Sequence, residues 1–311
     1  MNSPASRSAQ SPLPPLRKEL NRTVTVVICT SDRSALLRKC LEAVARLKPA
    51  ASDVLVVDNT VGDLGTEQAA LEFGARYTVE ANPGLSRARN RGLAESNSEI
   101  IAFLDDDAVP DEHWLGFLTE PFEDPTVAAV TGDTIPPGAE TGSNSPEPVR
   151  FLSNKDRQWF EIATFGGLGL GTNMALRKAA CKGWKVFDER LGRGAPFRIA
   201  EESHAFASLL SHGHRAVHNP AAIVFHPSKP IHIEQEAASA IAYWLLLFFE
   251  FPGHRMDMLR FLFRRLRQKP LTWPRDPQAP GELMTSGWRI RLKASVSGAL
   301  LYFSAKRAKD K

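Results

Sequence analysis

The sequence has no apolar run long enough to cross a lipid bilayer. The longest candidate extends from Ala237 to Phe249 and has 13 residues, whereas a membrane-spanning helix needs about 20. The first 21 residues are rich in serine and proline and have no apolar centre, so they make a poor signal peptide and indicate a disordered tail. We therefore expect a cytoplasmic protein.

Cysteine is also scarce. The chain has 3 cysteines, Cys29, Cys40 and Cys181, which are far apart and form no Cys-x-x-Cys pattern. An odd number of widely spaced cysteines provides no disulfide framework and is typical of a reducing compartment. No repeat predicts a solenoid, and 311 residues with 43% hydrophobic content can bury one full core.

Short apolar runs, by contrast, recur along the first third of the chain, and each one ends in polar residues. The runs Val24–Cys29, Val54–Val57 and Ile100–Leu104 have the composition of buried strands. Between the first two, apolar residues from Leu36 to Leu47 recur at helical spacing. This alternation predicts an α/β fold, in which a mostly parallel Rossmann-like sheet is flanked by helices and binds its ligand at the carboxyl ends of the strands.

The acidic run Asp105-Asp106-Asp107 directly follows one of these strands. Three carboxylates at the end of a buried strand need a cation, because burying them unpaired is costly. One of Asp105 and Asp107 can bind a divalent metal and the other a sugar hydroxyl, while the metal bridges the phosphates of a nucleotide. A plain acidic turn is the alternative.

Two other polar loops favour a nucleotide site. Asp58 ends the second strand, where its carboxylate can accept a hydrogen bond from the imide N–H of a pyrimidine base; a turn or helix cap is the alternative. The turn Asn82-Pro83-Gly84 then places Arg89 near a helix start, where phosphates bind favourably. A solvated helix face is the alternative for this arginine.

The order of these motifs resembles the family 2 glycosyltransferases of the GT-A fold, over roughly Val24 to Pro227. Five stretches carry the resemblance, and they follow one another in the family's order over about 150 residues. They are the Val-Val-Ile-Cys-Thr-x-Asp-Arg opening, the Val-Val-Asp-Asn strand end, the Asn-Pro-Gly-Leu-Ser-x-Ala-Arg-Asn loop, the Phe-Leu-Asp-Asp-Asp-x-x-Pro run and the Gly-x-Gly-Thr-Asn-Met-Ala-Leu-Arg stretch.

The resemblance implies a nucleotide-sugar donor, preferably of the UDP or dTDP type, and a Mg2+ or Mn2+ ion. It also implies transfer to a saccharide or lipid-linked acceptor with inversion at the anomeric carbon. By position it assigns Asp107 and His226 to the metal. The residues that it assigns to the donor are Thr30, Asp32, Arg33, Asp58, Asn59, Arg89, Asp105 and Asp106.

Transfer also requires a base, because the attacking hydroxyl must lose its proton. Glu201 and Glu202 open a helical stretch where similar enzymes carry a Glu-Asp pair whose Asp is the base, so Glu202 is the preferred base. Its side chain is one methylene longer, and His204 stands at the next position that is acidic in the family. The alternative is that both glutamates only complement the helix dipole.

The glycine-rich stretch Phe165–Thr172 can bring the backbone close to an acceptor. We therefore expect the acceptor near Gly171 and Thr172, with Trp159 as a stacking surface; a flexible loop is the alternative. Several other histidines lack a matching set of metal partners and are expected to be mainly solvated: His204, His212, His214 and His218.

The charge is divided unevenly along the chain. From Pro252 to Lys311 there are 14 Lys and Arg residues against 4 Asp and Glu residues, a net charge of +10, whereas the preceding residues carry a net charge of −6. A helix between Met256 and Arg267 would be amphipathic, and the following stretch has a second apolar seam. The first helix would present Met258, Leu259, Leu262, Phe263 and Leu266 opposite Arg260, Arg264 and Arg267, and the seam contains Trp288, Leu292, Val296, Ala299 and Phe303.

Such a basic amphipathic segment predicts an interfacial helix set on an anionic membrane surface. Packing against the catalytic domain, or against a partner in a homo-oligomer, is the alternative. Nucleic acid also fits the charge, but the chain has no recognition motif, so we expect no nucleic-acid partner.

We therefore predict three regions: a disordered tail at 1–21, a GT-A catalytic domain at 22–230 and a basic helical extension at 231–311. The predicted function is an inverting, metal-dependent hexosyltransferase of polysaccharide biosynthesis, cytoplasmic or peripheral on the inner face of the cell membrane. A nucleotidyltransferase is one alternative, although Thr30–Arg33 is not the glycine-rich basic loop that it would need. The other is an inactive nucleotide-sugar-binding or membrane scaffold protein, favoured by Glu202 and His204.

Overall fold

The computed structural model describes residues 20, 22–60, 64–139, 148–227, 233–266 and 288–309, without the side chains of 233–235, 265–266, 288–292 and 307–309. The predicted tail, apart from Leu20, lies outside the described residues, and so does Arg267. The same holds for the side chains of Arg265, Leu266, Trp288 and Leu292.

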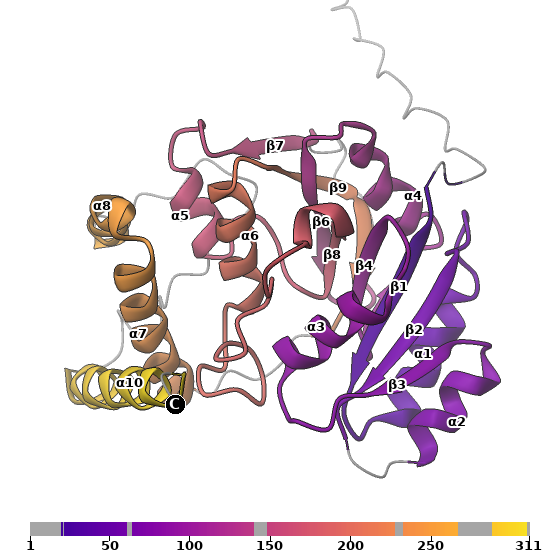
Figure 1. Cartoon of the computed structure of the whole chain (residues 1–311), viewed down its shortest axis with the longest axis horizontal. Helices are drawn as coiled ribbons and strands as arrows, with labels where there is room; N and C mark the ends of the chain where they lie inside the picture. The colour runs from indigo at the N-terminus through magenta and orange to yellow at the C-terminus, as the bar shows by residue number, and fades with distance from the viewer. Residues whose placement is uncertain are drawn as a thin grey trace, which may run out of the picture.

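A mixed sheet forms the centre of the fold (Figure 1), and its first half is parallel. Strands β3 (Arg76–Val79), β2 (Asp53–Asp58), β1 (Val24–Thr30) and β4 (Ile100–Asp105) lie side by side in that order. Helices connect them, and after β1 the buried residues Leu37, Leu41 and Val44 recur at helical spacing. The predicted α/β fold is therefore confirmed.

The second half of the sheet reverses direction. Strand β8 (Asn173–Arg177) runs antiparallel to β4 and to β6 (Val127–Ile135), while β6 is parallel to β9 (Arg215–Phe225). Two short strands, β5 (Val109–Pro110) and β7 (Arg150–Ser153), pair antiparallel with β9. The unbroken row of parallel neighbours that begins at β3 thus ends at β4, and the glycine-rich stretch leads into the antiparallel β8.

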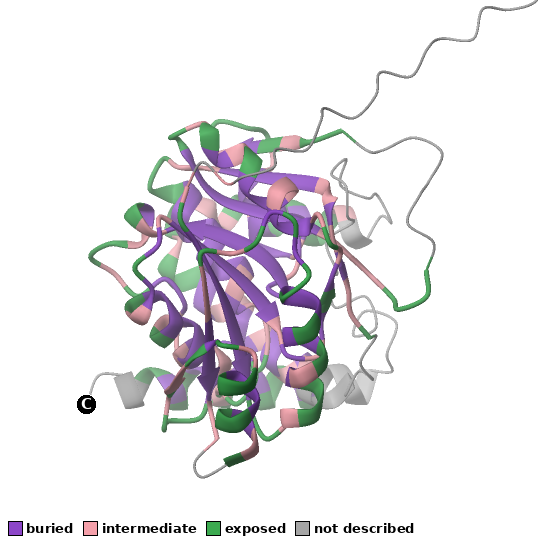
Figure 2. Ribbon diagram, turned by 90° about the vertical axis from the view of Figure 1, so that its right-hand side faces the viewer, coloured by how far each residue is buried: buried purple, intermediate pink, exposed green. Residues whose placement is uncertain are grey.

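Alternate residues of the central strands supply two cores, one on each face of the sheet, because side chains of a strand point to opposite sides in turn. Val27 and Phe103 join the core under α3 (Leu85–Glu95), α5 (Trp159–Thr164) and α6 (Glu201–Ser211). Val26 and Ala102 join the core under α1 (Ser34–Val44), α2 (Leu64–Glu72) and α4 (Trp114–Thr119). Figure 2 shows the strands buried between these layers.

The short 3-10 helices η1 (Glu120–Glu123) and η2 (Lys178–Cys181) complete the sheet domain. The C-terminal extension then forms α7 (Ile233–Glu250), the 3-10 helix η3 (Pro252–His254), α8 (Arg255–Leu266) and α10 (Trp288–Lys309). In Figure 1 these helices lie beside α5 and α6, on the side of the molecule away from α1 and α2. None of the described helices has the length and apolarity that a membrane span requires.

The extension shares its core with the sheet domain. Leu246 and Leu247 of α7 and Phe261 of α8 are buried in the same cluster as the residues of α5 and α6. Helix α10 lies along α7, and a Cβ added at Gly298 would be only 2.6 Å from the carbonyl oxygen of Ala238. The domain boundary at residue 230 stays a prediction, and the core continues across it.

The expectation that His204 and His218 are solvated is wrong, and the two faces of α8 are also divided differently from the prediction. His204 and His218 are buried rather than solvated, because both imidazoles lie beside carboxylates from other elements. In α8 the buried face is formed by Met258 and Phe261. Arg264 also turns inward, where it forms an ion pair with the buried Glu161 of α5. The exposed apolar face of α8 therefore differs from the predicted one.

Candidate active site

The carboxyl ends of β1, β2 and β4 lie at one level of the sheet. In the strand register Thr30 is opposite Asp58, and Cys29 is opposite Asp105. Because the strands are parallel neighbours, the polar residues that follow them meet at one edge, as the sequence predicts. We call this edge the donor edge.

The middle residue of the acidic run points into the protein. Asp106 is fully buried, accepts a hydrogen bond from the Thr30 hydroxyl at 2.6 Å and pairs with the Nη2 atom of Arg33 at 2.7 Å. Burial raises the pKa of Asp106 to about 6, although the Thr30 hydrogen bond and the Arg33 charge act in the opposite direction. Asp106 therefore fixes the loop after β1, and Thr30 and Arg33 are engaged with it.

Its two neighbours meet His226, which follows β9, and Asp107 also pairs with the Nη1 atom of Arg33 at 3.3 Å. The imidazole Nε2 of His226 lies 3.0 Å from Oδ1 of Asp107 and 3.6 Å from Oδ2 of Asp105. The three side chains offer ligand atoms that all lie within 4.8 Å of one another. Carboxylate oxygens suit Mg2+ and Mn2+, and a neutral imidazole adds a third ligand. The residues therefore fit a divalent cation, and we call Asp105, Asp107 and His226 the metal group.

The charge on this group depends on protons as well as on metal. Burial alone lowers the pKa of His226, but its hydrogen bonds with Asp105 and Asp107 raise it to about 9. At neutral pH the imidazolium thus offsets one of the two carboxylate charges. A divalent cation would take over that role and release the proton, since only neutral imidazole binds metal.

Arg89 connects the metal group to the helix of the predicted base. Its guanidinium is 3% exposed, lies 2.8 Å from Oε1 of Glu201 and 3.5 Å from Oδ1 of Asp105. Gly171 lies against it, and a Cβ there would be 2.7 Å from both terminal nitrogens. Burial lowers the pKa of Arg89, but the charges of Glu201 and Asp105 raise it by more, so that the pKa lies above its usual value. The arginine therefore positions carboxylates, and its predicted contact with a nucleotide stays a prediction.

Glu202 is the member of the glutamate pair that Arg89 does not bind in the structure. It lies in the first turn of α6, and although the residue as a whole is partly exposed, its carboxylate group is buried. Burial of its carboxylate raises the pKa of Glu202 to about 8, the charge of Glu201 raises it as well, and Arg89 opposes both. A carboxylate with a pKa near neutrality can both accept and hold a proton, as a general base must.

Asp58 and Asn59 are engaged with the protein. The carboxylate of Asp58 accepts hydrogen bonds from the Tyr77 hydroxyl at 2.9 Å and from the backbone N–H of Thr60 at 2.8 Å. The amide of Asn59 donates to the carbonyl groups of residues 80 and 82 and accepts from the N–H of Gly84. Asn59 therefore holds the turn before α3. Asp32 is exposed, with a φ of 54°.

The predicted acceptor residues lie in two places. Gly171 lies against Arg89 at the site, and the buried hydroxyl of the next residue, Thr172, has no hydrogen-bond partner among the described residues. Trp159 is only 8% exposed, with its ring edge-on to Phe160 and His254. A stacking surface at Trp159 is thus largely covered, and all three assignments stay predictions.

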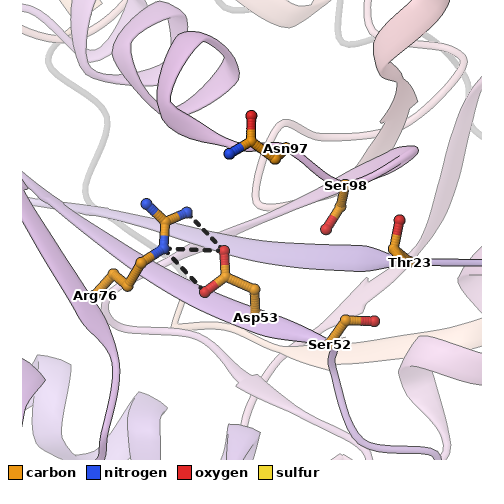
Figure 3. Close-up of a pocket in the computed structure, with 6 residues that line it drawn as sticks. All are labelled: Thr23, Ser52, Asp53, Arg76, Asn97 and Ser98. Atoms are coloured by element: carbon orange, nitrogen blue, oxygen red, sulfur yellow. Dashed lines mark hydrogen bonds and ion pairs between the residues drawn. The ribbon is translucent and has the colours of Figure 1, made fainter.

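A hollow of about 410 Å³ lies at the other end of the sheet, where the strands begin. Figure 3 shows its lining, in which the Arg76 guanidinium faces the Asp53 carboxylate with Asn97 and Ser98 above them. The salt bridge is 2.6 Å long and exposed. This hollow is remote from the carboxyl ends of the strands and contains none of the predicted site residues.

Sequence reasoning missed the residues that connect α6 to the rest of the chain. Arg190, Asp188 and Glu250 form an ion-pair group with His204. Arg190 and Glu250 are 60 residues apart, so no local pattern could indicate the pair. The sequence offers one signal. His204 stands at a position that is acidic in the similar glycosyltransferases, and a histidine there needs a carboxylate from another element as its partner.

Several known proteins are similar to this chain. Glycosyltransferase AglE of Haloferax volcanii is 36% identical over 100 residues, which cover 30% of this chain and 33% of the relative. The probable glycosyltransferase YdaM of Bacillus subtilis is 27% identical over 274 residues, which cover 81% of this chain and 60% of the relative. The chain thus spans between a third and three fifths of these two curated relatives.

Solved structures share the fold at low identity. The mannosyltransferase PcManGT from Pyrobaculum calidifontis, in complex with GDP-Man and Mn2+, superposes with a TM-score of 0.53 at 17% identity and covers 93% of this chain and 76% of that chain. S. aureus TarS gives a TM-score of 0.57 at 14% identity and covers 90% of this chain and 54% of that chain. Residues 25–184, just over half of the chain, match the sequence model of glycosyl transferase family 2, and the protein belongs to that family.

Proposed function

We propose that the protein is a metal-dependent glycosyltransferase that moves a sugar from a nucleotide-diphosphate donor to an acceptor with inversion. The observation that carries this proposal is the double contact of Arg89. One guanidinium binds Asp105 of the metal group and Glu201 of α6. We call α6 the base helix because it carries Glu202. A donor held at the first and an acceptor activated at the second would therefore meet within one site.

Asp105, Asp107 and His226 would hold the divalent cation, Mg2+ or Mn2+. The cation would supply charge stabilisation to the departing diphosphate. The related mannosyltransferase from Pyrobaculum calidifontis is described with Mn2+ and GDP-Man, which supports the same cofactor class here. Asp107 is the ligand nearest to His226, and it is the residue whose removal should disturb the site most.

Glu202 would act as the base. Its carboxylate is not bound by Arg89 and takes up a proton with a pKa of about 8. It would accept the proton of the acceptor hydroxyl as that oxygen attacks the anomeric carbon and the bond to the diphosphate breaks. A single displacement of this kind inverts the anomeric centre.

The donor edge would bind the nucleotide, with a preference for UDP or dTDP donors. Asp58 lies at the end of β2, as the resemblance requires for contact with the base, and Asp32 is exposed in the loop after β1. Thr30, Arg33, Asn59 and Asp106 shape the loops through the contacts described above. Binding of the base at Asp58 would replace or share its hydrogen bonds with Tyr77 and Thr60.

The acceptor would be a saccharide or a lipid-linked compound, bound near Gly171 and Thr172. A relative from Haloferax volcanii, a glucosyl-dolichyl phosphate glucuronosyltransferase, is 24% identical and covers 65% of this chain and 68% of the relative. A lipid-linked acceptor would fit a protein that binds the inner face of the cell membrane through its exposed C-terminal helices. A soluble saccharide and a homo-oligomer through the same helices form the alternative.

A donor screen tests the function. Purified protein is melted with UDP-, dTDP- and GDP-sugars in Mn2+, in Mg2+ and in chelator, and each stabilising sugar is then assayed for release of nucleoside diphosphate. We expect one sugar class to raise the melting temperature in metal only. Stabilisation by none of them would contradict the proposal. Binding without turnover would indicate an inactive binding protein, and pyrophosphate release from a nucleoside triphosphate would indicate a nucleotidyltransferase.

A further inference from the structure

Four charged residues join the C-terminal extension to the helix that carries the proposed base. Glu250, the last residue of α7, lies 2.5 Å from Nη2 of Arg190 through Oε1 and 3.2 Å from Nε2 of His204 through Oε2. The Nε of Arg190 also donates to both carboxylate oxygens of Asp188, at 2.9 and 3.1 Å. We call Asp188, Arg190, His204 and Glu250 the α7 clamp.

The α7 clamp is an ion-pair network and not a second metal site. Asp188, His204 and Glu250 bring ligand atoms within 4.8 Å of one another, but the Arg190 guanidinium already pairs with both carboxylates. Burial raises the pKa of Glu250, yet its hydrogen bonds with His204 and Arg190 lower it below the usual value. Glu250 is therefore ionised, and two partners hold it.

On one side, the clamp holds a loop that contacts the first turn of α3. Arg190 belongs to loop 187–197, in which the carbonyl of Leu191 accepts from the Ser86 hydroxyl at 2.7 Å. In the same loop the carbonyl of Arg193 accepts from the N–H of Leu85 at 2.8 Å. Both bonds reach the first turn of α3, the helix of Arg89.

The same loop touches the glutamate that Arg89 binds. Gly192 has a φ of 91°, and a Cβ there would lie 3.1 Å from the Glu201 carboxylate. A displaced loop would therefore press on Glu201 or leave it unsupported. Since Glu201 is covalently next to Glu202, any shift of its ion pair also moves the proposed base.

On the other side, the clamp acts on α6 directly. His204 lies in the first turn of that helix, two residues after Glu202, and its backbone N–H donates to the carbonyl of Ala200 at 3.0 Å. Its imidazole is fixed by Glu250 from α7. Holding this ring sets the rotation of the first turn about the helix axis, and with it the direction of Glu202.

We infer that Glu250 is a positioning residue for sugar transfer: through Arg190 and His204 it holds loop 187–197 and the first turn of α6, so that Glu202 keeps its place. The inference rests on the proposed function and extends it, because it gives the C-terminal extension a part in the reaction. A displacement near 1 Å can cost about 100-fold in rate. The partly exposed carboxylate of Glu250 can therefore affect turnover although it lies outside the site.

The test replaces Glu250 in the full-length protein. Glu250→Ala removes both contacts, and we expect kcat to fall by about 10- to 100-fold while the KM for the donor stays within about twofold of wild type. Glu236→Ala, near the opposite end of the same helix, is the matched control and should leave both constants unchanged. Glu250→Gln keeps the shape and one hydrogen-bonding oxygen, so it should restore part of kcat.

Two further measurements separate positioning from general destabilisation. Amide hydrogen exchange over residues 199–206 should be faster in Glu250→Ala and not in Glu236→Ala, with the strands of the sheet unaffected. Arg190→Ala combined with Glu250→Ala should cost little more in kcat than the larger single loss, because residues that act as one unit are not additive.

The inference is overturned if Glu250→Ala is folded and turns over at the wild-type rate, or if only the donor KM changes. It is also overturned if exchange over residues 199–206 is unchanged. Should wild-type protein transfer no sugar from any donor, the proposed function fails by itself, and the exchange measurement still decides whether Glu250 holds the first turn of α6.

Discussion

The donor edge and the base helix are built in different ways. At the donor edge, Asp58 and Asp105 come from adjacent parallel strands, and each is placed by the strand that precedes it. Glu202 has no such strand before it, and the first turn of α6 that carries it is held through Glu201, by Arg89 and loop 187–197, and through His204, by the end of α7. The first arrangement fixes ligands through the sheet, whereas the second depends on helix packing.

The largest effect should come from the donor edge. Asp107→Ala removes a carboxylate from the metal group, and we expect transfer to fall by roughly 1000-fold, since a bound cation contributes several kcal/mol to charge stabilisation. Nucleoside-diphosphate affinity should fall strongly in Mn2+ and little in chelator. Titration calorimetry under both conditions measures this difference.

Glu42→Ala, on the exposed side of α1, serves as the control for Asp107→Ala and should bind like wild type. Equal nucleotide affinity of wild type and Asp107→Ala in both conditions would mean that the group does not bind a catalytic metal. The donor edge would then resemble an ordinary acidic turn.

The next effect concerns the base helix. Glu202→Gln should keep donor binding and lower turnover by about 100-fold or more, the usual contribution of a positioned base. Glu201→Gln should act differently, because it weakens the buried pair with Arg89 at 2.8 Å. We expect it to lower the melting temperature, with its loss of turnover following from the shift of α6.

Single-turnover rates and melting curves of both variants compare the two glutamates. If Glu201→Gln abolishes turnover without any loss of stability and Glu202→Gln is neutral, Glu201 is the base. The contrast between a chemical and a supporting glutamate would then be reversed.

A smaller effect is the pH dependence of stability. Folding raises the pKa of Glu202 from the usual 4.5 to about 8, so its protonated form is the one that the fold stabilises. The stability that the protonated Glu202 carboxyl contributes is fully present below pH 4.5 and is lost as the pH rises through about 8. Glu202→Gln has no such group. Its melting temperature should therefore exceed that of wild type by more at pH 9 than at pH 5.

Activity should follow the opposite direction, because the base must be ionised. For wild type, kcat/KM should rise with pH through about 8, and the residual activity of Glu202→Gln should lack that limb. A wild-type profile that is flat between pH 6 and 9, together with equal melting differences at both pH values, would show that Glu202 is not held as described.

The same contrast explains what the sequence could predict. Asp105, Asp107 and the strand end at Asp58 follow apolar runs directly, so a local pattern locates them. Asp106 and Thr30 also lie at strand ends, but their contact with each other depends on which way each side chain turns. The fold class and the donor edge were predictable for this reason.

Contacts between helices far apart in the chain were not predictable. The basic sequence of α8 predicts that Arg264 contacts a lipid headgroup, yet its partner Glu161 lies about 100 residues earlier. His204 was expected in solvent because its neighbours in the sequence offer no partner, and Glu250 supplies one from α7. Only the packing of the extension on α5 and α6 decides these positions.

The extension still presents an exposed apolar surface. On α8, Met256, Leu259 and Phe263 are each more than half exposed. Arg260 lies beside them with a side chain that is 66% exposed, in an ion pair at 3.0 Å with the neighbouring Asp257 on the same surface. This face would enter the acyl boundary of an anionic membrane while the arginine contacts headgroups. Since Arg264 is bound to Glu161, it is not available for headgroups.

The smallest single-residue effect is therefore expected at this surface. Arg260→Gln should weaken binding to anionic vesicles about fivefold, since one basic residue near such a surface contributes about 1 kcal/mol, and the loss should vanish at high salt. Leu259→Ala with Phe263→Ala should reduce binding at every salt concentration, and Lys39→Gln on α1 should have no effect. Vesicle flotation measures all three. If full-length protein stays in solution with strongly anionic vesicles at low salt, the exposed face of α8 contacts another copy of the protein instead. Sedimentation would then show a concentration-dependent dimer. The acceptor in that case is a soluble saccharide.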